Sequence, residues 1–273
     1  MYINEKGQAV AGPVVKMSKK DFASQDQTSI YWMGSASIYI QSHGTKIMID
    51  PLLKGFDMPL LFDMPILPQD VPSLDGVLIT HIDNDHFSRI TCSNLKSVCK
   101  SYHAPHYVAS VMNEEEIPGV GHDIGESFKI GSIDVTLTKA VHNWQNGSKK
   151  YQYRTWLEED YCGYYLKTKD CTIWLPGDSK LIEEHLHMPT PDVILFDFSD
   201  NEWHITLEGA IKLANTYPDA TLICIHWGSV DAPDMTPFNG NPENLLDKVI
   251  NPERIQVLAP GEVYQLKKES VRQ

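Results

Sequence analysis

Residues 77–86 read VLITHIDNDH, an apolar run followed at once by four side chains that can bind metal ions. His81 and Asp83 are two residues apart, so an extended backbone points both side chains the same way. Asp85 and His86 are adjacent and fit a turn after the strand, aimed at a second nearby point. The spacing therefore suits two metal ions rather than one, and imidazole combined with carboxylate matches zinc, manganese or iron.

Three further candidate ligands follow apolar strands later in the chain. His142 ends the run VTLTKAVH, Asp178 follows TIWLPG, and His226 follows LICI. The glycine before Asp178 permits a tight turn at that strand end. Polar side chains that repeatedly follow apolar strands indicate one rim of a sheet structure.

The rest of the chain combines many short strands with few helices. The predicted helices cover 89–100, 207–217 after an N-cap at Thr206, and 243–250. The predicted strands are two runs within 29–50 around a turn at 42–44, then 77–80, 126–130, 133–140, 161–168, 171–176, 193–198, 222–227 and a final hairpin within 255–266. This composition of elements favours two sheets flanked by helices.

Residues 52–74 form a long apolar segment in which the tripeptide Asp-Met-Pro occurs twice. Its prolines exclude a regular helix or a central strand. Long loops of this kind are often functional lids. The alternative is a segment packed over the core or against a second subunit, and the sequence supports both interpretations equally.

The ordered set of candidate ligands resembles the metallo-β-lactamase fold superfamily of metal-dependent hydrolases. That family's pattern is HxHxDH, then a His, an Asp after Gly, and a His, each at a strand end. The resemblance covers about residues 28–266 and implies a four-layer αββα sandwich of two mixed sheets, with residues 1–273 forming one domain. Through Asp50-Pro51, residues 206–210 (TLEGA) and His226-Trp227, the chain is most similar to the branch of ascorbate phosphate lactonase and N-acyl phosphatidylethanolamine phospholipase D.

The resemblance implies a dinuclear hydrolase with two divalent metal ions per chain. One ion is expected on His81, Asp83 and His142, the other on Asp85, His86 and His226, with Asp178 bridging both. Asp83 departs from the family pattern, which has His there, and a hard oxygen ligand moves preference from zinc toward manganese or iron. The superfamily's diiron oxygen reductases also carry a carboxylate at this position, but they need a flavin domain for which this length leaves no room.

The expected reaction is the attack of a metal-bridging hydroxide on a lactone or similar ester of a small, anionic and phosphorylated metabolite. Asp85 is expected to act as the proton acceptor or shuttle besides being a ligand. A phosphodiesterase of the same fold is the alternative enzyme, and a non-catalytic metal-binding protein, with Asp83 marking lost activity, is the alternative outside enzymes.

Candidate substrate-binding residues flank this set. Lys149, Lys150 and Arg154 follow His142 and either steer an anion or belong to a solvated loop. His204 follows the strand 193–198 and is expected on the same rim as the metals. Trp144, Trp203 and Trp227 either line the pocket or are buried.

Composition narrows the classes of partner. The chain has 273 residues, 42% hydrophobic and 22% charged, with a formal net charge of −13 that disfavours a nucleic-acid binder or nuclease. No apolar run approaches the ~18 residues of a membrane span, and no signal peptide is expected. Five cysteines without a CxxC pair indicate reduced thiols and a cytoplasmic protein. A homo-oligomer is compatible with the sequence.

Overall fold

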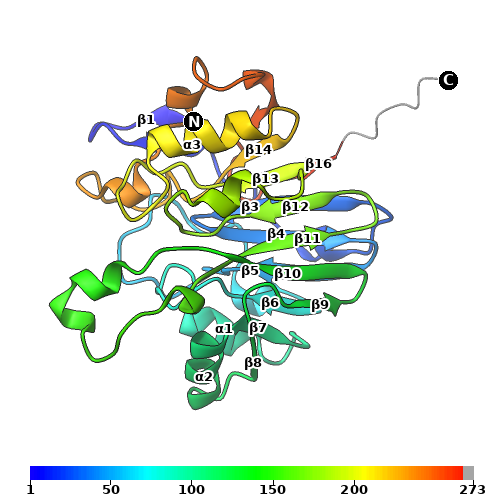
Figure 1. Cartoon of the computed structure of the whole chain (residues 1–273). Coiled ribbons are helices and arrows are strands. Elements are labelled where there is room, and N and C mark those ends of the chain that lie inside the picture. Colours follow the sequence, from blue (N-terminus) through cyan, green and yellow to red (C-terminus); the bar gives the residue numbers. More distant parts are fainter. Residues whose placement is uncertain (267–273) are drawn as a thin grey trace.

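Two seven-stranded mixed sheets face each other in the computed structural model, which describes residues 1–266 (Figure 1). The first sheet has the strand order β16 (Val263–Gln265), β3 (Thr28–Gly34), β4 (Ser37–Ser42), β5 (Thr45–Ile49), β6 (Gly76–Leu78), β7 (Tyr102–Pro105) and β8 (Gly119–His122). The second has the order β15 (Ile255–Gln256), β14 (Thr221–Cys224), β13 (Val193–Phe196), β12 (Thr172–Leu175), β11 (Cys162–Lys167), β10 (Ile133–Lys139) and β9 (Ser127–Ile130). Strands β1 (Tyr2–Ile3) and β2 (Ala9–Val10) form a separate small hairpin.

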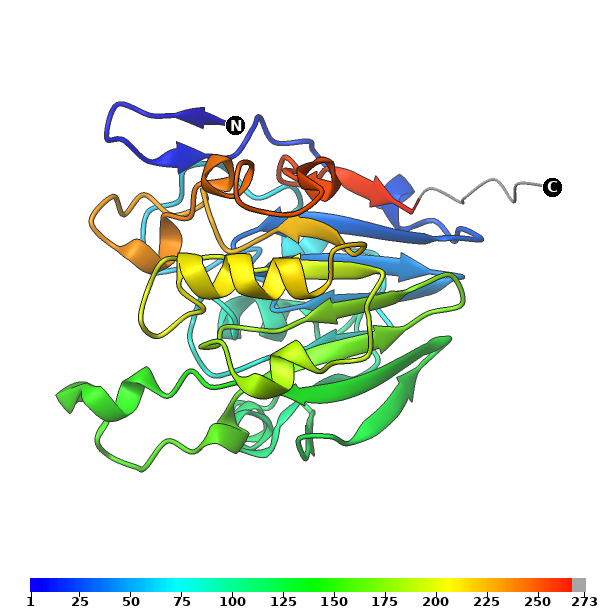
Figure 2. The ribbon, with the colours of Figure 1, turned by 45° about the horizontal axis from the view of Figure 1, so that its top comes forward.

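Side-chain alternation along the strands explains the layers. On β3, Ile30 and Trp32 belong to the core between the sheets, whereas Tyr31 and Met33 pack on the opposite face. That outer face is covered by α1 (Arg89–Leu95) and α2 (His106–Glu114). Helix α3 (Leu207–Thr216) lies across the outer face of the second sheet (Figure 2). The predicted four-layer αββα sandwich is therefore confirmed.

Short 3-10 turns occupy the connections between these elements. They lie at Lys19–Phe22, Pro68–Asp70, Trp144–Gly147, Lys149–Tyr151, Glu158–Asp160, Glu183–Leu186, Thr236–Phe238, Pro242–Leu245 and Pro252–Arg254. No helix within residues 1–266 is both long and apolar enough to cross a bilayer. All five cysteines are free thiols, four of them buried.

Three predictions of secondary structure were wrong. The expected C-terminal hairpin does not form, because β15 pairs with β14 in one sheet and β16 pairs with β3 in the other. The helix predicted over 89–100 ends at Leu95, and the helix predicted over 243–250 is only a 3-10 turn at Pro242–Leu245. Helix α2 was not predicted, and it begins at His106, directly after Pro105.

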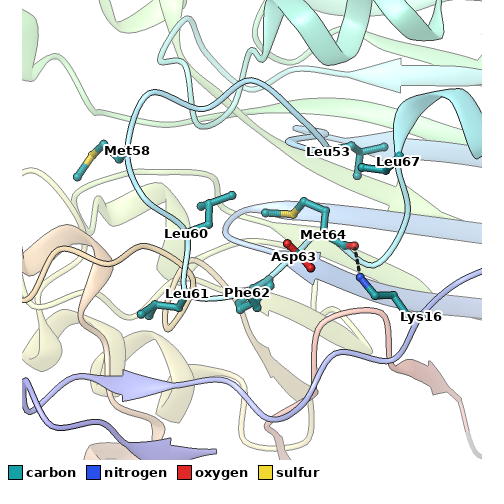
Figure 3. Close-up of a pocket in the computed structure, with 9 residues that line it drawn as sticks. All are labelled: Lys16, Leu53, Met58, Leu60, Leu61, Phe62, Asp63, Met64 and Leu67. Carbon is teal, nitrogen blue, oxygen red and sulfur yellow. Dashed lines mark hydrogen bonds between the residues drawn. The ribbon is translucent and has the colours of Figure 1, made fainter.

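The segment 52–74 is anchored on both sides and reaches the rim at its tip. The Leu53 amide donates to Thr91 Oγ1 at 3.1 Å, the carbonyl of Pro65 accepts from Met17, and Leu60 forms a β-bridge with Val230. An open groove of about 830 Å³ lies along the segment, where Lys16 donates to the carbonyl of Met64 (Figure 3). The segment thus packs on the body of the protein while residues 56–58 line the pocket described below.

Candidate metal centre

The candidate ligands lie where β6, β10, β12 and β14 end. His81, His142, Asp178 and His226 each follow one of these strands by two or three residues. Gly177 has a φ of 74°, and a Cβ there would stand 2.5 Å from the carbonyl oxygen of Cys162, so only glycine fits before Asp178. His226 itself has a φ of 60°, and its amide donates to the carbonyl of Ser35 at 2.8 Å. These constrained turns direct the side chains to one point.

One carboxylate oxygen stands at that point. Asp178 Oδ2 has four imidazole Nε2 atoms around it, at 3.1 Å from His86, 3.5 Å from His226, 3.8 Å from His204 and 3.9 Å from His142. All five side chains are buried. Asp178 therefore lies at the centre of the histidine cluster.

Three close sets of candidate ligand atoms occur among the described residues. Asp85, His86 and His226 offer ligand atoms that all lie within 4.8 Å of one another, and this is the set expected for the second metal. A further set consists of Asp178, Asp197, His204 and His226, and the other close set consists of His81, His142 and Asp178.

Asp83 stands next to that other set. Its Oδ2 lies 3.3 Å from His81 Nε2 and 3.6 Å from His142 Nε2. The structure thus brings all seven sequence-predicted ligands together.

Unpaired buried nitrogens test whether this cluster fits metal ions. His81 Nε2 and His86 Nε2 have no hydrogen-bond partner among residues 1–266, although both side chains are only 1% exposed. An unsatisfied buried polar atom costs about 1–3 kcal/mol. Both nitrogens face aspartate oxygens at 3.1–3.6 Å, so a cation between them would satisfy nitrogen and oxygen together. The donor set of imidazole and carboxylate therefore fits a divalent metal ion.

Asp50 orients His86 from the side away from the pocket and was not among the predicted site residues. Its Oδ2 accepts from His86 Nδ1 at 2.8 Å and from Thr80 Oγ1 at 2.6 Å, and its Oδ1 accepts from the Thr80 amide at 2.8 Å. The bond to Nδ1 leaves His86 Nε2 free to face the ligand cluster. The Asp-Pro dipeptide after an apolar strand was the available signal.

His204 lies at the rim beside the cluster, as predicted. Its Nδ1 donates to Asp197 Oδ2 at 2.7 Å, and Asp197 Oδ1 accepts from both the amide and the hydroxyl of Ser199, at 2.9 and 2.8 Å. His204 Nε2 consequently faces the pocket and Asp178. Asp197 lies behind His204 and was missed because it falls inside the apolar run 193–198, where the sequence indicates only a strand.

A pocket of about 470 Å³ opens above the cluster. Its polar floor includes Asp83, Asp85 and Asp178, and its walls are mainly aromatic and apolar, from Phe56, Met58, Trp144, Tyr151, Trp203 and Phe238. Part of the wall belongs to the segment after β10, which projects from one edge of the sandwich (Figure 1).

The predicted substrate residues divide between this pocket and the rest of the protein. Lys150 and His204 line it. Lys149 is exposed and lies outside the lining. Arg154 forms an ion pair with Asp160 at 2.8 Å and stacks on Tyr107, so its charge is already matched. Trp227 is buried in the core and stacks on Trp32.

The buried histidines and aspartates of the cluster shift one another's pKa values toward the charged forms. Burial disfavours charged imidazole, but Asp178 and Asp85 outweigh burial and raise the pKa of His226 to about 9 and that of His86 well above its usual value. Burial would likewise raise the pKa of Asp178, yet the surrounding histidines hold that pKa well below its usual value. Without metal, protons on His86 and His226 therefore balance the carboxylates, whereas burial and the neighbouring His86 lower the pKa of His81.

This balance predicts opposite pH effects with and without metal. A histidine with a raised folded pKa stabilises the fold fully below its unfolded value, and the stabilisation is lost as the pH rises through the folded value. We expect chelator-treated protein to lose thermal stability between about pH 6.5 and about 9, the window of His226. Added Mn²⁺ should stabilise the protein increasingly over that window, because metal binding needs deprotonated imidazole. Melting curves with chelator and with Mn²⁺ test this, and curves independent of pH would contradict it.

Three kinds of comparison relate this chain to known proteins. The family model described as beta-lactamase superfamily domain matches residues 45–227. A metal-dependent hydrolase from Archaeoglobus fulgidus is 24% identical over 250 residues, which cover 88% of this chain and 99% of that protein. The N-acyl-phosphatidylethanolamine-hydrolyzing phospholipase D 1 of Caenorhabditis elegans is 23% identical over 251 residues, covering 80% of this chain and 68% of that protein. Among solved structures, a possible metal-dependent hydrolase from Veillonella parvula has the same fold, with a TM-score of 0.70, 18% identity and coverage of 88% of this chain and 100% of that one.

Proposed function

The chain belongs to the beta-lactamase superfamily domain family and is a metal-dependent hydrolase of that fold, and from this premise we propose that it opens a lactone or similar ester of a small anionic molecule. The observation that carries the proposal is the buried cluster around Asp178, whose unpaired nitrogens need cations.

In this proposal two divalent ions occupy the cluster. His81, Asp83 and His142 would hold one, Asp85, His86 and His226 would hold the other, and Asp178 would be available to both. Divalent ions bound there supply Lewis acidity, which makes water nucleophilic at neutral pH and stabilises the charge that develops on the substrate oxygen. No serine or cysteine nucleophile is then required.

The chain's own residues handle the proton and the substrate. Asp85 lines the pocket and its Oδ2 stands 3.3 Å from His226 Nε2, so it is placed to accept a proton from water and to pass it on to the leaving group. His204 presents Nε2 to the pocket and is held in orientation by Asp197, which suits a hydrogen bond to the substrate.

The pocket walls constrain the rest of the substrate. Among the described lining residues, Lys150 is the single lysine or arginine, against several aromatic side chains. A highly charged metabolite would find little charge compensation there. We therefore propose a substrate whose apolar part contacts the aromatic walls and whose single anionic group faces Lys150.

Neutralising Lys150 tests the anionic group. Lys150→Gln should lower kcat/KM for an anionic ester by about tenfold and flatten its dependence on salt, because electrostatic steering is lost. Lys149→Gln is the matched control, since Lys149 is exposed and lies outside the pocket lining. Equal kinetics and equal salt dependence in both variants would remove the anionic group from the proposal.

A phosphodiesterase is the second candidate, favoured by the similarity to the Caenorhabditis elegans phospholipase D. The test is a panel of lactones, carboxylic esters and phosphodiesters, assayed with Mn²⁺ and with Zn²⁺. We expect the carboxylic substrates to be turned over faster. Turnover of phosphodiesters alone would favour the second candidate, and metal-loaded protein without activity on any of them would favour a binding protein.

A further inference from the structure

Asp83 accepts two hydrogen bonds from one segment of the pocket wall. Gln145 Nε2 donates to Asp83 Oδ1 at 2.7 Å, and Trp144 Nε1 donates to Asp83 Oδ2 at 2.8 Å. Gln145 is fully buried, so its amide has no access to water as an alternative partner. Both oxygens of Asp83 are thus fixed in direction before any cation binds.

Tyr161 fixes the orientation of that amide. Its hydroxyl donates to Gln145 Oε1 at 2.5 Å, which leaves the amide nitrogen directed at Asp83. The Tyr161 ring is buried and lies against the rings of His81 and His142, with centroids 5.7 and 5.9 Å apart. The three residues Trp144, Gln145 and Tyr161 therefore form a cradle around Asp83, named here the Asp83 cradle.

Counting donors and acceptors shows which side chain the Asp83 cradle accepts. A carboxylate accepts hydrogen bonds only and has lone pairs left over for a cation. A neutral imidazole has one accepting nitrogen, and when that nitrogen binds a metal the other ring nitrogen is a donor. Histidine at position 83 would then leave the donor of Trp144 and the buried donor of Gln145 facing another donor.

We propose that Trp144, Gln145 and Tyr161 are positioning residues that commit position 83 to a carboxylate and thereby tune this half of the metal centre toward Mn²⁺ or Fe²⁺ over Zn²⁺. A hard oxygen in place of a nitrogen is the physical basis of the preference. Trp144 also lines the substrate pocket, so its hydrogen bond to Asp83 connects the pocket wall directly to a candidate metal ligand. The inference rests on the proposed metal centre but not on the identity of its substrate.

The experiment compares Asp83→His in two backgrounds, the natural protein and the double variant Trp144→Phe/Gln145→Leu. The measurements are competition binding of Mn²⁺ and Zn²⁺ alone, and the melting temperature of metal-free protein. In the natural background, Asp83→His should weaken binding of both ions by about 10–100-fold, the usual effect of a disturbed outer shell. It should also lower the melting temperature of the metal-free protein.

The double variant should reverse the outcome. With Asp83 retained it should lose Mn²⁺ affinity by about 10–100-fold. With Asp83→His added, Zn²⁺ binding should recover and the preference should move to Zn²⁺. Equal effects of Asp83→His in both backgrounds, on binding and on melting, would overturn the proposal, because independent sites give additive effects.

Two further variants keep the test decisive. Tyr161→Phe removes one hydroxyl and leaves the fold intact, and it should lower Mn²⁺ affinity more than Zn²⁺ affinity, whereas an unchanged ratio would count against the Asp83 cradle. Trp156→Phe is the control, because Trp156 lies in the same segment and donates to the carbonyl of Tyr151 instead. Natural protein that bound neither ion would refute the metal centre itself. The melting temperatures of the metal-free variants would still show whether the effect of Asp83→His on stability depends on the Asp83 cradle.

Discussion

Asp178→Asn is expected to leave the protein folded while metal content falls and kcat drops by at least ~100-fold, the upper end of losses from a disturbed metal shell. Asparagine keeps the size of the side chain but loses its charge. Asp178 Oδ2 stands among four imidazole nitrogens at 3.1–3.9 Å, so the lost charge affects both sets of ligands at once. A carboxylate shared by two cations also offsets their mutual repulsion, and an amide does this poorly.

The fold should survive because its core does not depend on the site. The layer between the sheets consists of apolar side chains such as Ile38, Val135 and Leu166, each 0% exposed. Small zinc-dependent domains behave differently, since metal binding drives their folding.

Circular dichroism, elemental analysis and turnover on one preparation measure the effect of Asp178→Asn. Asp192→Asn is the control, because Asp192 directly precedes β13 and its Oδ2 accepts from the amide and hydroxyl of Thr172, at the start of the strand β12 that Asp178 follows. Its metal content and turnover should equal those of the natural protein. Near-normal turnover of Asp178→Asn with full metal would remove Asp178 from the centre and, with it, the shared-carboxylate proposal.

The ligand cluster was accessible from sequence because its geometry is local. His81, Asp83, Asp85 and His86 follow one strand within six residues, and His142, Asp178 and His226 each end another. Side-chain alternation and strand ends are short-range properties, so they predict which residues share a rim. The residues behind the ligands are different: Asp50 is 36 positions from His86, and Gln145 is 62 positions from Asp83. Packing creates such pairs, and although the Asp50-Pro51 dipeptide marks a strand end, nothing in the sequence indicates which ligand Asp50 or Gln145 contacts.

The predicted pairing of the two C-terminal strands was wrong for the same reason, because packing with distant strands decides it. Residues 255–266 have β-forming composition, but the partners of β15 and β16 lie in different sheets. Trp227 gives a parallel case, since it follows His226 directly and yet points into the core against Trp32. The positive φ of His226 turns the chain at this point, and the sequence carries no signal for it. Two neighbouring residues at this turn therefore point in different directions, His226 toward the ligand cluster and Trp227 into the core.

Asp50→Asn should weaken metal binding by about 10–100-fold, although Asp50 does not line the pocket. The effect should act through His86, whose ring Asp50 holds in orientation. Asp50 has a φ of 45°, a conformation that asparagine tolerates as well as aspartate does, so the backbone is unchanged. Asparagine replaces one accepting oxygen by an NH₂ donor. That donor must face either the Thr80 amide or the pair formed by Thr80 Oγ1 and His86 Nδ1, and both arrangements lose a buried hydrogen bond.

The same argument separates orientation from stability. Asp50→Asn should also lower the free energy of unfolding by about 1–3 kcal/mol, the cost of an unsatisfied buried group. Tyr102→Phe removes a buried hydroxyl that donates to the carbonyl of Cys92 at 2.9 Å and touches no candidate ligand, so it should reduce stability with little change in metal affinity. Metal titrations and chemical unfolding of the two variants distinguish the effects. Equal metal affinities in Asp50→Asn and the natural protein would show that His86 keeps its orientation without the carboxylate, because packing against the His81 ring, 4.0 Å away, would then suffice to hold it.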